Sequence, residues 1–432
     1  MMQESKFTWA AHRITSFFVD SILHSRTKGY TYKAVGLLSG AFFLSASFKV
    51  LRAISALYPR RTWGIFDSIN YRLNSTFDIF HPVFIFPLVF AGFISISSYR
   101  ISNLALVSIL IGIGFFSVGV RASRRFKFNE LLLEANLERF TAFLLLVGIT
   151  SLIYDVMQTG GIPLLDPATR RQLSVPFTML ASLTVPGGIL LISLIGRKHQ
   201  RGELSIEEAR VYALITMLLI TALMSLIGYR TQIIVSLLGS AIAMYYTRLI
   251  GKAEILLSFF LGVIAISTVG YYRALAQGSS IAFFDVIGKR VGLTLSIYDS
   301  LVERFWVFGA NKGSVFLAGF SSFLSFVPGP RLGPRTIVAQ IYGVRDVSIT
   351  STLYGTAILD FGIPGIMVFS LVMGFILGLA YRAVKQTKTA ISVGIFSLLL
   401  AYALVGIETG LVDFNVLMFF LFGFLILLRS IR

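Results

Sequence analysis

Ten long apolar runs constrain this chain more than any other feature of its sequence. A hydrocarbon core about 30 Å thick needs about 20 apolar residues per helix. Because lipid offers no hydrogen-bond partners, a chain that crosses it repeatedly must be helical there, unless it forms a closed barrel. The runs are Ile79–Ser98, Ile101–Val120, Phe140–Val156, Val175–Ile195, Val211–Ile227, Gln232–Tyr246, Ala253–Thr268, Ile363–Ala383, Ala390–Ile407 and Leu411–Leu428. The sequence therefore predicts an all-α polytopic membrane protein of about 10–11 transmembrane helices.

The first 78 residues carry two weaker signals. Ala34–Leu57 is an eleventh candidate span, but Lys49 and Arg52 interrupt it, so the pattern leaves its crossing open. Phe7–Leu23 places apolar side chains on one face and polar ones on the other, which predicts a helix lying in the membrane interface. The resulting regions are the N-terminal region (1–78), a seven-span core (79–268), a long loop (269–361) and three C-terminal spans (362–432).

Charge gives the predicted orientation. Only 13% of the residues are charged, against roughly 25% in soluble proteins, which excludes a soluble enzyme or a disordered chain. The net charge is +18, and its basic residues lie mostly between the spans, so we predict membrane lipids rather than nucleic acid as the partner. Four basic groups fall on one side of the bilayer, which the positive-inside rule makes cytoplasmic. These groups are Arg121–Lys127, Arg197–Arg201, Arg248–Lys252 and Arg382–Lys388. The chain is thus predicted to lie in the cytoplasmic membrane.

The long loop, residues 269–361, is then predicted to face outward. Loops this long without a role are uncommon. It carries eight Lys and Arg against five Asp and Glu, contrary to the positive-inside bias. An anionic ligand would account for this excess. Its apolar stretches predict short helices at the bilayer surface.

Arginines at predicted outer helix ends are the candidate anion ligands. Arginine binds phosphate bidentately, and a helix N-terminus adds backbone donors. Each arginine has an alternative role, in which it contacts lipid headgroups or pairs with a carboxylate. For Arg230 we favour the ligand role, because its turn is too short to swing freely. The candidate diphosphate ligands are Arg230, Arg273, Arg170, Arg171 and Arg290.

Three outward carboxylates are candidates for acid–base chemistry. Asp299 and Glu303 are one helical turn apart, and Asp360 precedes a span. Ionisable groups near a bilayer are functional candidates, although a salt bridge is an equally good explanation for each. All four histidines fall on the predicted cytoplasmic side, so no outward histidine base is expected. Cysteine is absent, and the sequence shows neither a metal-ligand cluster nor a nucleotide-binding motif. We therefore predict no metal and no cofactor.

Several short motifs occur in a recognisable order. Gly160-Gly161-Ile162-Pro163-Leu164 follows a middle span, and Gly228–Arg230 forms a turn before an apolar helix. The long loop comes next, followed by Thr352…Gly355…Asp360-Phe361-Gly362…Gly365 leading into a span. In this order the chain, over roughly residues 80–430, resembles the oligosaccharide repeat unit polymerases, the Wzy-type O-antigen polymerases.

The resemblance implies a membrane glycosyltransferase of the GT-C type that builds a cell-envelope polysaccharide. Such an enzyme polymerises polyprenyl-diphosphate-linked repeat units on the outer face, with inverting displacement of the lipid diphosphate. Arg230 and Arg273 would stabilise the leaving diphosphate, helped by Arg170 and Arg171. A flippase and chain-length regulator proteins would be its partners. One of Asp299, Glu303 and Asp360 would act as general base.

Three other classes share parts of this pattern. An O-antigen ligase transfers a lipid-linked glycan once, but an outward histidine is often expected there. Peptidoglycan polymerases of cell shape and division also have about ten spans and a large outer loop. A lipid-linked glycan flippase or transporter should place polar residues at mid-bilayer and have short loops on both sides. The nearly charge-free spans and the long loop favour the polymerase.

Overall fold

The computed structural model describes residues 78–129, 136–161, 163–164, 169–170, 172–258, 285–324, 326–344 and 348–431. The chain divides into two compact units, residues 1–63 and 64–432, and the description below concerns the second. The predicted interfacial helix Phe7–Leu23 and the candidate span Ala34–Leu57 lie outside the described residues. Most of the predicted span Ala253–Thr268 does so too.

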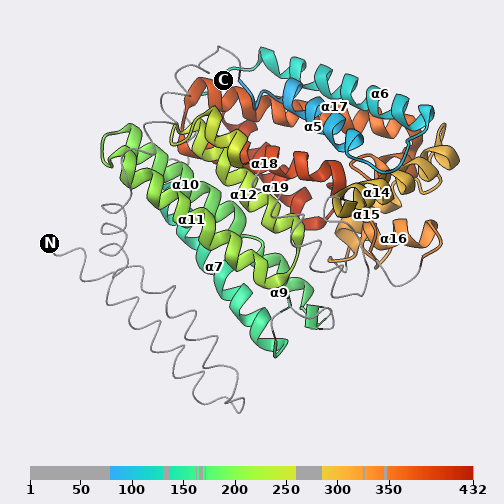
Figure 1. Cartoon of the computed structure of the whole chain (residues 1–432), viewed down its shortest axis with the longest axis horizontal. Coiled ribbons are helices and arrows are strands. Elements are labelled where there is room, and N and C mark those ends of the chain that lie inside the picture. Colours follow the sequence, from blue (N-terminus) through green and yellow to red (C-terminus); the bar gives the residue numbers. More distant parts are fainter. Residues whose placement is uncertain are drawn as a thin grey trace. The chain divides into compact units, whose positions relative to one another are not determined.

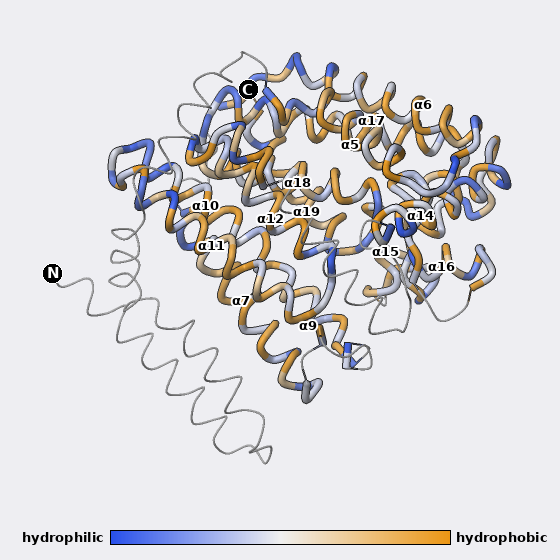
Figure 2. The backbone as a smooth tube through the Cα atoms, viewed as in Figure 1, coloured by the Kyte–Doolittle hydropathy of each residue, from blue (hydrophilic) through white to orange (hydrophobic). Residues whose placement is uncertain are grey.

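The described part of the second unit is built from helices (Figure 1). They are α5 (Pro82–Ser95), α6 (Asn103–Ala122), α7 (Leu137–Gln158), α9 (Val175–Ala181), α10 (Thr184–Gln200), α11 (Ile206–Ile227), α12 (Arg230–Tyr246), α14 (Asp285–Phe305), α15 (Ser314–Ser321), α16 (Pro334–Ile341), α17 (Gly355–Thr387), α18 (Ala390–Thr409) and α19 (Phe414–Arg429). Among the described residues six helical segments are long and apolar enough to cross a membrane, while α5 and α19 are shorter and apolar. Hydrophilic residues gather at helix ends and turns (Figure 2). The prediction of an all-α polytopic membrane protein is confirmed.

Two predicted spans have different boundaries in the structure. The run Val175–Ile195 forms two helices, α9 and α10, which meet at Ser182 and Leu183. The last long-loop residues already belong to α17, which begins at Gly355 rather than near Ile363. Gly362 interrupts this helix with φ 67° and ψ −151°. The apolar run thus corresponds to the part of α17 that follows the break.

Small residues let α6 and α17 approach closely. A Cβ atom on Gly374 of α17 would lie 2.1 Å from the carbonyl oxygen of Phe116, and one on Gly119 of α6 would lie 2.2 Å from that of Leu371. Both distances are far below van der Waals contact, so only glycine permits this spacing. Close backbone approach at small residues replaces the hydrophobic driving force that is missing between helices in lipid.

Helix α18 forms the centre of the described bundle. Its sequence is apolar on all sides, and nearly all of its residues are buried. A helix of this kind is expected to be surrounded by other helices rather than to face a solvent. It packs against α5, α10, α12, α17 and α19.

Within the described part of the long loop, three helices lie together at one end of the bundle. Helices α14, α15 and α16 cluster there in Figure 1. Helix α14 contacts α6 and α17, and α15 contacts α17 and α19. The N-termini of α6, α12, α17 and α19 and the C-termini of α7, α11 and α18 belong to this end, which we call the predicted outer end.

A half-buried polar cluster joins helices at the opposite end. The Asp78 carboxylate accepts hydrogen bonds from the Tyr246 hydroxyl at 2.9 Å and the Tyr381 hydroxyl at 3.0 Å. It also pairs with Lys385 Nζ at 2.7 Å. These contacts join the chain just before α5 to the C-terminal parts of α12 and α17.

We expect Asp78→Ala to destabilise the protein by about 2–4 kcal/mol, because it removes these three contacts and the hydrogen bond from the Phe80 N–H to Asp78 Oδ1 at 3.1 Å. Tyr246→Phe removes one of the hydrogen bonds and should have a smaller effect, about 1.5 kcal/mol. Thermal unfolding of the purified variants measures both changes. Equal stability of Asp78→Ala and wild type would show that the cluster does not hold these helices together.

Candidate functional site

Buried carboxylates at the predicted outer end bind the N-termini of other helices. Asp299 of α14 accepts hydrogen bonds from the Ser102 backbone N–H at 3.0 Å and the Tyr99 hydroxyl at 2.8 Å, and it also contacts the Ser102 hydroxyl. Ser102 is the N-cap of α6. Free N–H groups and the helix dipole make such a terminus a favourable place for an anion.

Asp360 and Asp155 likewise accept backbone N–H groups at the N-termini of other helices. Asp360, on α17, accepts from the backbone N–H groups of Val315 at 3.1 Å and Phe316 at 2.8 Å, in the first turn of α15. Asp155 of α7 accepts from the N–H of Ser174, the N-cap of α9, at 2.8 Å. Each carboxylate therefore anchors a second helix. Glu303 differs from them, since it lies exposed on α14 one turn beyond Asp299.

The structure brings two of the sequence motifs into contact. Gly228 ends α11 with φ 78°, and Arg230 begins α12. A Cβ atom on Gly228 would lie 3.3 Å from the Cα atom of Leu164 and 3.6 Å from Cδ of Arg170. The Leu164 N–H also donates to the carbonyl oxygen of Leu226 at 3.2 Å. The glycine-rich loop after α7 thus packs on the turn that holds Arg230.

The pKa of Tyr229 depends on the charged side chains around this turn. Desolvation raises the pKa of its phenol, and the nearby Asp155 carboxylate raises it further. The guanidinium groups of Arg170 and Arg335 act in the opposite direction and lower this pKa. Of these arginines, Arg170 packs on the turn itself, and Arg230 follows Tyr229 directly in the chain. We call Arg170, Arg230 and Arg335 the arginine group.

Two members of the arginine group lie at the start of a helix. Arg230 begins α12, and Arg335 lies in the first turn of α16. A helix N-terminus is the positive end of the helix dipole, so a cation there is unfavourable. Neither first turn contains an acidic residue.

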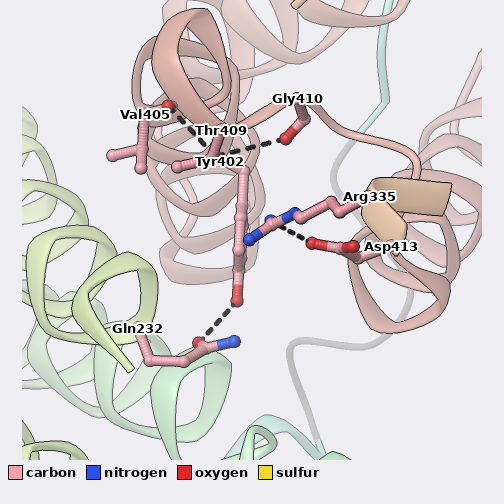
Figure 3. A network of polar contacts seen from close by, with 7 residues as sticks. All are labelled: Gln232, Arg335, Tyr402, Val405, Thr409, Gly410 and Asp413. Carbon is pink, nitrogen blue, oxygen red and sulfur yellow. Dashed lines mark hydrogen bonds and ion pairs between the residues drawn. The ribbon is translucent and has the colours of Figure 1, made fainter. Parts of the chain in front are cut away.

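Two ion pairs lie around the α18–α19 turn. Arg335 pairs with Asp413, the N-cap of α19 (Figure 3). Arg290 Nε of α14 lies 2.5 Å from Glu408 Oε1 near the end of α18. Arg290 therefore pairs with a carboxylate, which is the alternative to binding an anionic ligand.

A hydrogen bond joins the interior of α18 to the first turn of α12. The hydroxyl of Tyr402 donates to Oε1 of Gln232 at 2.9 Å, and Figure 3 shows both side chains beside the Arg335–Asp413 pair. Gln232 is two residues after Arg230. This hydrogen bond holds the first turn of α12 against α18.

A small pocket opens beside the Arg335–Asp413 pair. Its cavity volume of about 10 Å³ matches about one water molecule. Its walls come from α16, the segment before α17, α17 itself and the α18–α19 turn. The lining residues are Pro334, Arg335, Val338, Ile349, Thr350, Ser351, Thr352, Thr356, Thr409, Gly410, Val412 and Asp413.

The predicted site residues do not all lie in one place. Arg170 and Arg230 are brought together, whereas Arg290, Asp299 and Asp360 take part in the pairings described above. Arg171 and Arg273 lie outside the described residues. Sequence reasoning did not select Arg335 or Asp413, because their role arises from contact between α16 and the start of α19. The only available signal was the place of Arg335 directly after Pro334, at the end of a turn-rich stretch.

Fold and site define a polytopic helical membrane protein with arginines gathered at one end of its bundle. Residues 78–420 match the family described as "Putative O-antigen polymerase", and the chain belongs to this family. It is also similar to "Uncharacterized protein MJ0419" of Methanocaldococcus jannaschii, with 29% identity over 339 residues that span 76% of this chain and 89% of that protein. No solved structure matches the chain.

Proposed function

We propose that this protein is a GT-C type glycosyltransferase that polymerises polyprenyl-diphosphate-linked repeat units at the outer face of the cytoplasmic membrane. The observation that carries the proposal is the packing of the segment with Leu164 and Arg170 on the turn that holds Arg230. The guanidinium groups of Arg170 and Arg230 suit a ligand with several negative charges, such as a diphosphate, whereas Arg335 already pairs with Asp413. Family membership supports a lipid-linked glycan as the substrate.

The proposed reaction is an inverting displacement. A hydroxyl oxygen of the acceptor glycan forms a bond to the anomeric carbon of the donor, while the bond from that carbon to the diphosphate oxygen breaks. Negative charge grows on the leaving diphosphate, and fixed guanidinium groups stabilise it without reorganising. Arg171, Arg273 and Arg290 are proposed as further contributors. The acceptor proton passes to a carboxylate base.

Among the three candidate bases we propose to test Glu303 first. The carboxylate oxygens of Asp299 and Asp360 already accept backbone N–H groups of neighbouring helices. Glu303 is exposed, so a substrate can reach its carboxylate.

We expect Glu303→Gln to lower the rate of glycan transfer by about 100-fold or more while leaving thermal stability unchanged. Asp360→Asn should instead destabilise the protein by about 1–3 kcal/mol, because its amide nitrogen cannot accept an N–H. Transfer rates and unfolding temperatures of both variants distinguish the roles. An unchanged rate for Glu303→Gln would remove Glu303 as the base.

The function itself is tested with purified protein and polyprenyl-diphosphate-linked repeat units from the native host. A ladder of products spaced by one repeat unit, separated on a gel, is expected for a polymerase. A single block added to a foreign acceptor would indicate a ligase instead. Movement of the intact substrate across vesicle membranes without any product would indicate a flippase and would refute the glycosyltransferase assignment.

A further inference from the structure

The pocket beside the Arg335–Asp413 pair contains two buried hydroxyl groups with unused hydrogen-bonding capacity. Thr352 is 1% exposed and Thr356 is 7% exposed. Within the part of the chain that the structure describes, Oγ1 of neither threonine has a hydrogen-bond partner. Buried hydroxyls normally have one, so a molecule that enters the pocket is their natural partner.

The backbone holds Thr352 in an uncommon conformation. Its φ is 62°, which is unusual for any residue except glycine and especially for a β-branched one. The neighbouring Thr350 hydroxyl lies 3.1 Å from the Thr294 hydroxyl of α14, so this segment is fixed by its surroundings. Conformations of this kind persist where the fold enforces them, and they concentrate at binding sites.

The charges around the pocket select a neutral ligand. Asp413 would repel a phosphate, and Arg335 would repel a cation. A hydroxyl group can donate to the Asp413 carboxylate and accept from the Arg335 guanidinium, and each threonine hydroxyl can serve in either role. The cavity has room for one such group.

We propose that this pocket is a sugar-hydroxyl subsite, in which one hydroxyl of a glycan replaces a water molecule. The proposal rests on the proposed function for its source of glycan. Its position fits that function, because Arg335 belongs both to this pocket and to the arginine group around Tyr229. A sugar attached to a diphosphate held by the arginine group would therefore lie next to the pocket.

The test uses Thr356→Val, which exchanges an unpartnered hydroxyl for a methyl group of the same shape. Because no hydrogen bond within the described chain is lost, we expect this variant to be at least as stable as wild type. Thr356→Ser keeps a hydroxyl and should behave as wild type. Thr141→Val is the matched control, since the Thr141 hydroxyl is also buried and unpartnered in the described residues, but it lies near the start of α7.

The measurement is binding of the free repeat-unit oligosaccharide, released from its lipid diphosphate, to the full-length protein in nanodiscs by saturation-transfer NMR. We expect Thr356→Val to weaken binding about three- to ten-fold, the effect of one neutral hydrogen bond, with Thr141→Val unchanged. Equal binding by Thr356→Val and wild type, or no binding by wild type at millimolar glycan, would overturn the subsite.

The ladder assay on the same preparations separates this proposal from the proposed function. A wild type that makes a ladder while Thr356→Val retains full glycan affinity refutes the subsite alone. A wild type that binds glycan with the expected variant pattern, but makes no ladder, refutes the polymerase and supports the subsite.

Discussion

Gly362→Ala is expected to prevent stable folding. Gly362 has φ 67° and ψ −151°, a region that is essentially open only to glycine. A Cβ atom there would also lie 2.6 Å from the carbonyl oxygen of Val307. Strain and overlap together should destabilise the protein by more than about 3 kcal/mol. The measurement is the yield of monodisperse protein and its unfolding temperature.

The break at Gly362 explains why this change should be so damaging. The Ile363 N–H donates to the carbonyl oxygen of Trp306 at 3.1 Å, so the break lets α17 contact the chain after α14. Just before the break, Asp360 holds the start of α15. Pro364 follows in the first turn of the second segment, where its missing N–H is tolerated.

A matched control separates this effect from a general sensitivity to alanine. A Cβ atom added to Gly92 of α5 would meet no other atom within 4 Å, and this glycine lies inside a regular helix. Gly92→Ala should change stability by no more than about 1 kcal/mol. If Gly362→Ala were as stable as Gly92→Ala, the special role of the break would be refuted.

Arg230→Ala is expected to reduce chain growth by about 100-fold or more, the effect of removing one donor that stabilises developing negative charge. The fold should persist within about 1 kcal/mol, because a cation at a helix N-terminus does not favour the helix. Arg230→Lys keeps the charge but loses the planar fork, so an intermediate rate is expected. Ladder intensity per unit time, together with the unfolding temperature, measures both effects.

Arg125→Ala is the control for lost surface charge. Arg125 is exposed after α6, at the end opposite the arginine group. We expect its ladder to equal that of wild type. Wild-type product lengths and rates from Arg230→Ala would exclude Arg230 from the site.

Most helices could be predicted from the sequence because a helix that crosses a bilayer must be long enough and apolar enough to do so. The run Ile101–Val120 matches α6, and Ala390–Ile407 matches α18, to within a few residues. The break within Val175–Ile195 could not be predicted in this way, because both of its helices are apolar. Hydropathy identifies segments that can lie in lipid, but it does not show whether such a segment is one continuous helix.

The candidate site was harder to predict because its contacts join distant segments. Asp299 and Ser102 are 197 residues apart, so no local pattern identifies Asp299 as an anchor for α6. Arg335 and Asp413 are 78 residues apart, and Arg335 is only one of eight cations in the long loop. Arg230 was identifiable because its constraint, a tight glycine turn before a helix, is local.

The central claim is that the arginine group holds the diphosphate of a lipid-linked donor. Its most direct test is the binding of labelled polyprenyl diphosphate to wild type, to Arg125→Ala and to a double variant carrying Arg170→Ala and Arg230→Ala. Two lost charge-assisted contacts should weaken binding about 100-fold in the double variant, with Arg125→Ala unchanged. Equal affinity of the double variant and wild type would contradict the account.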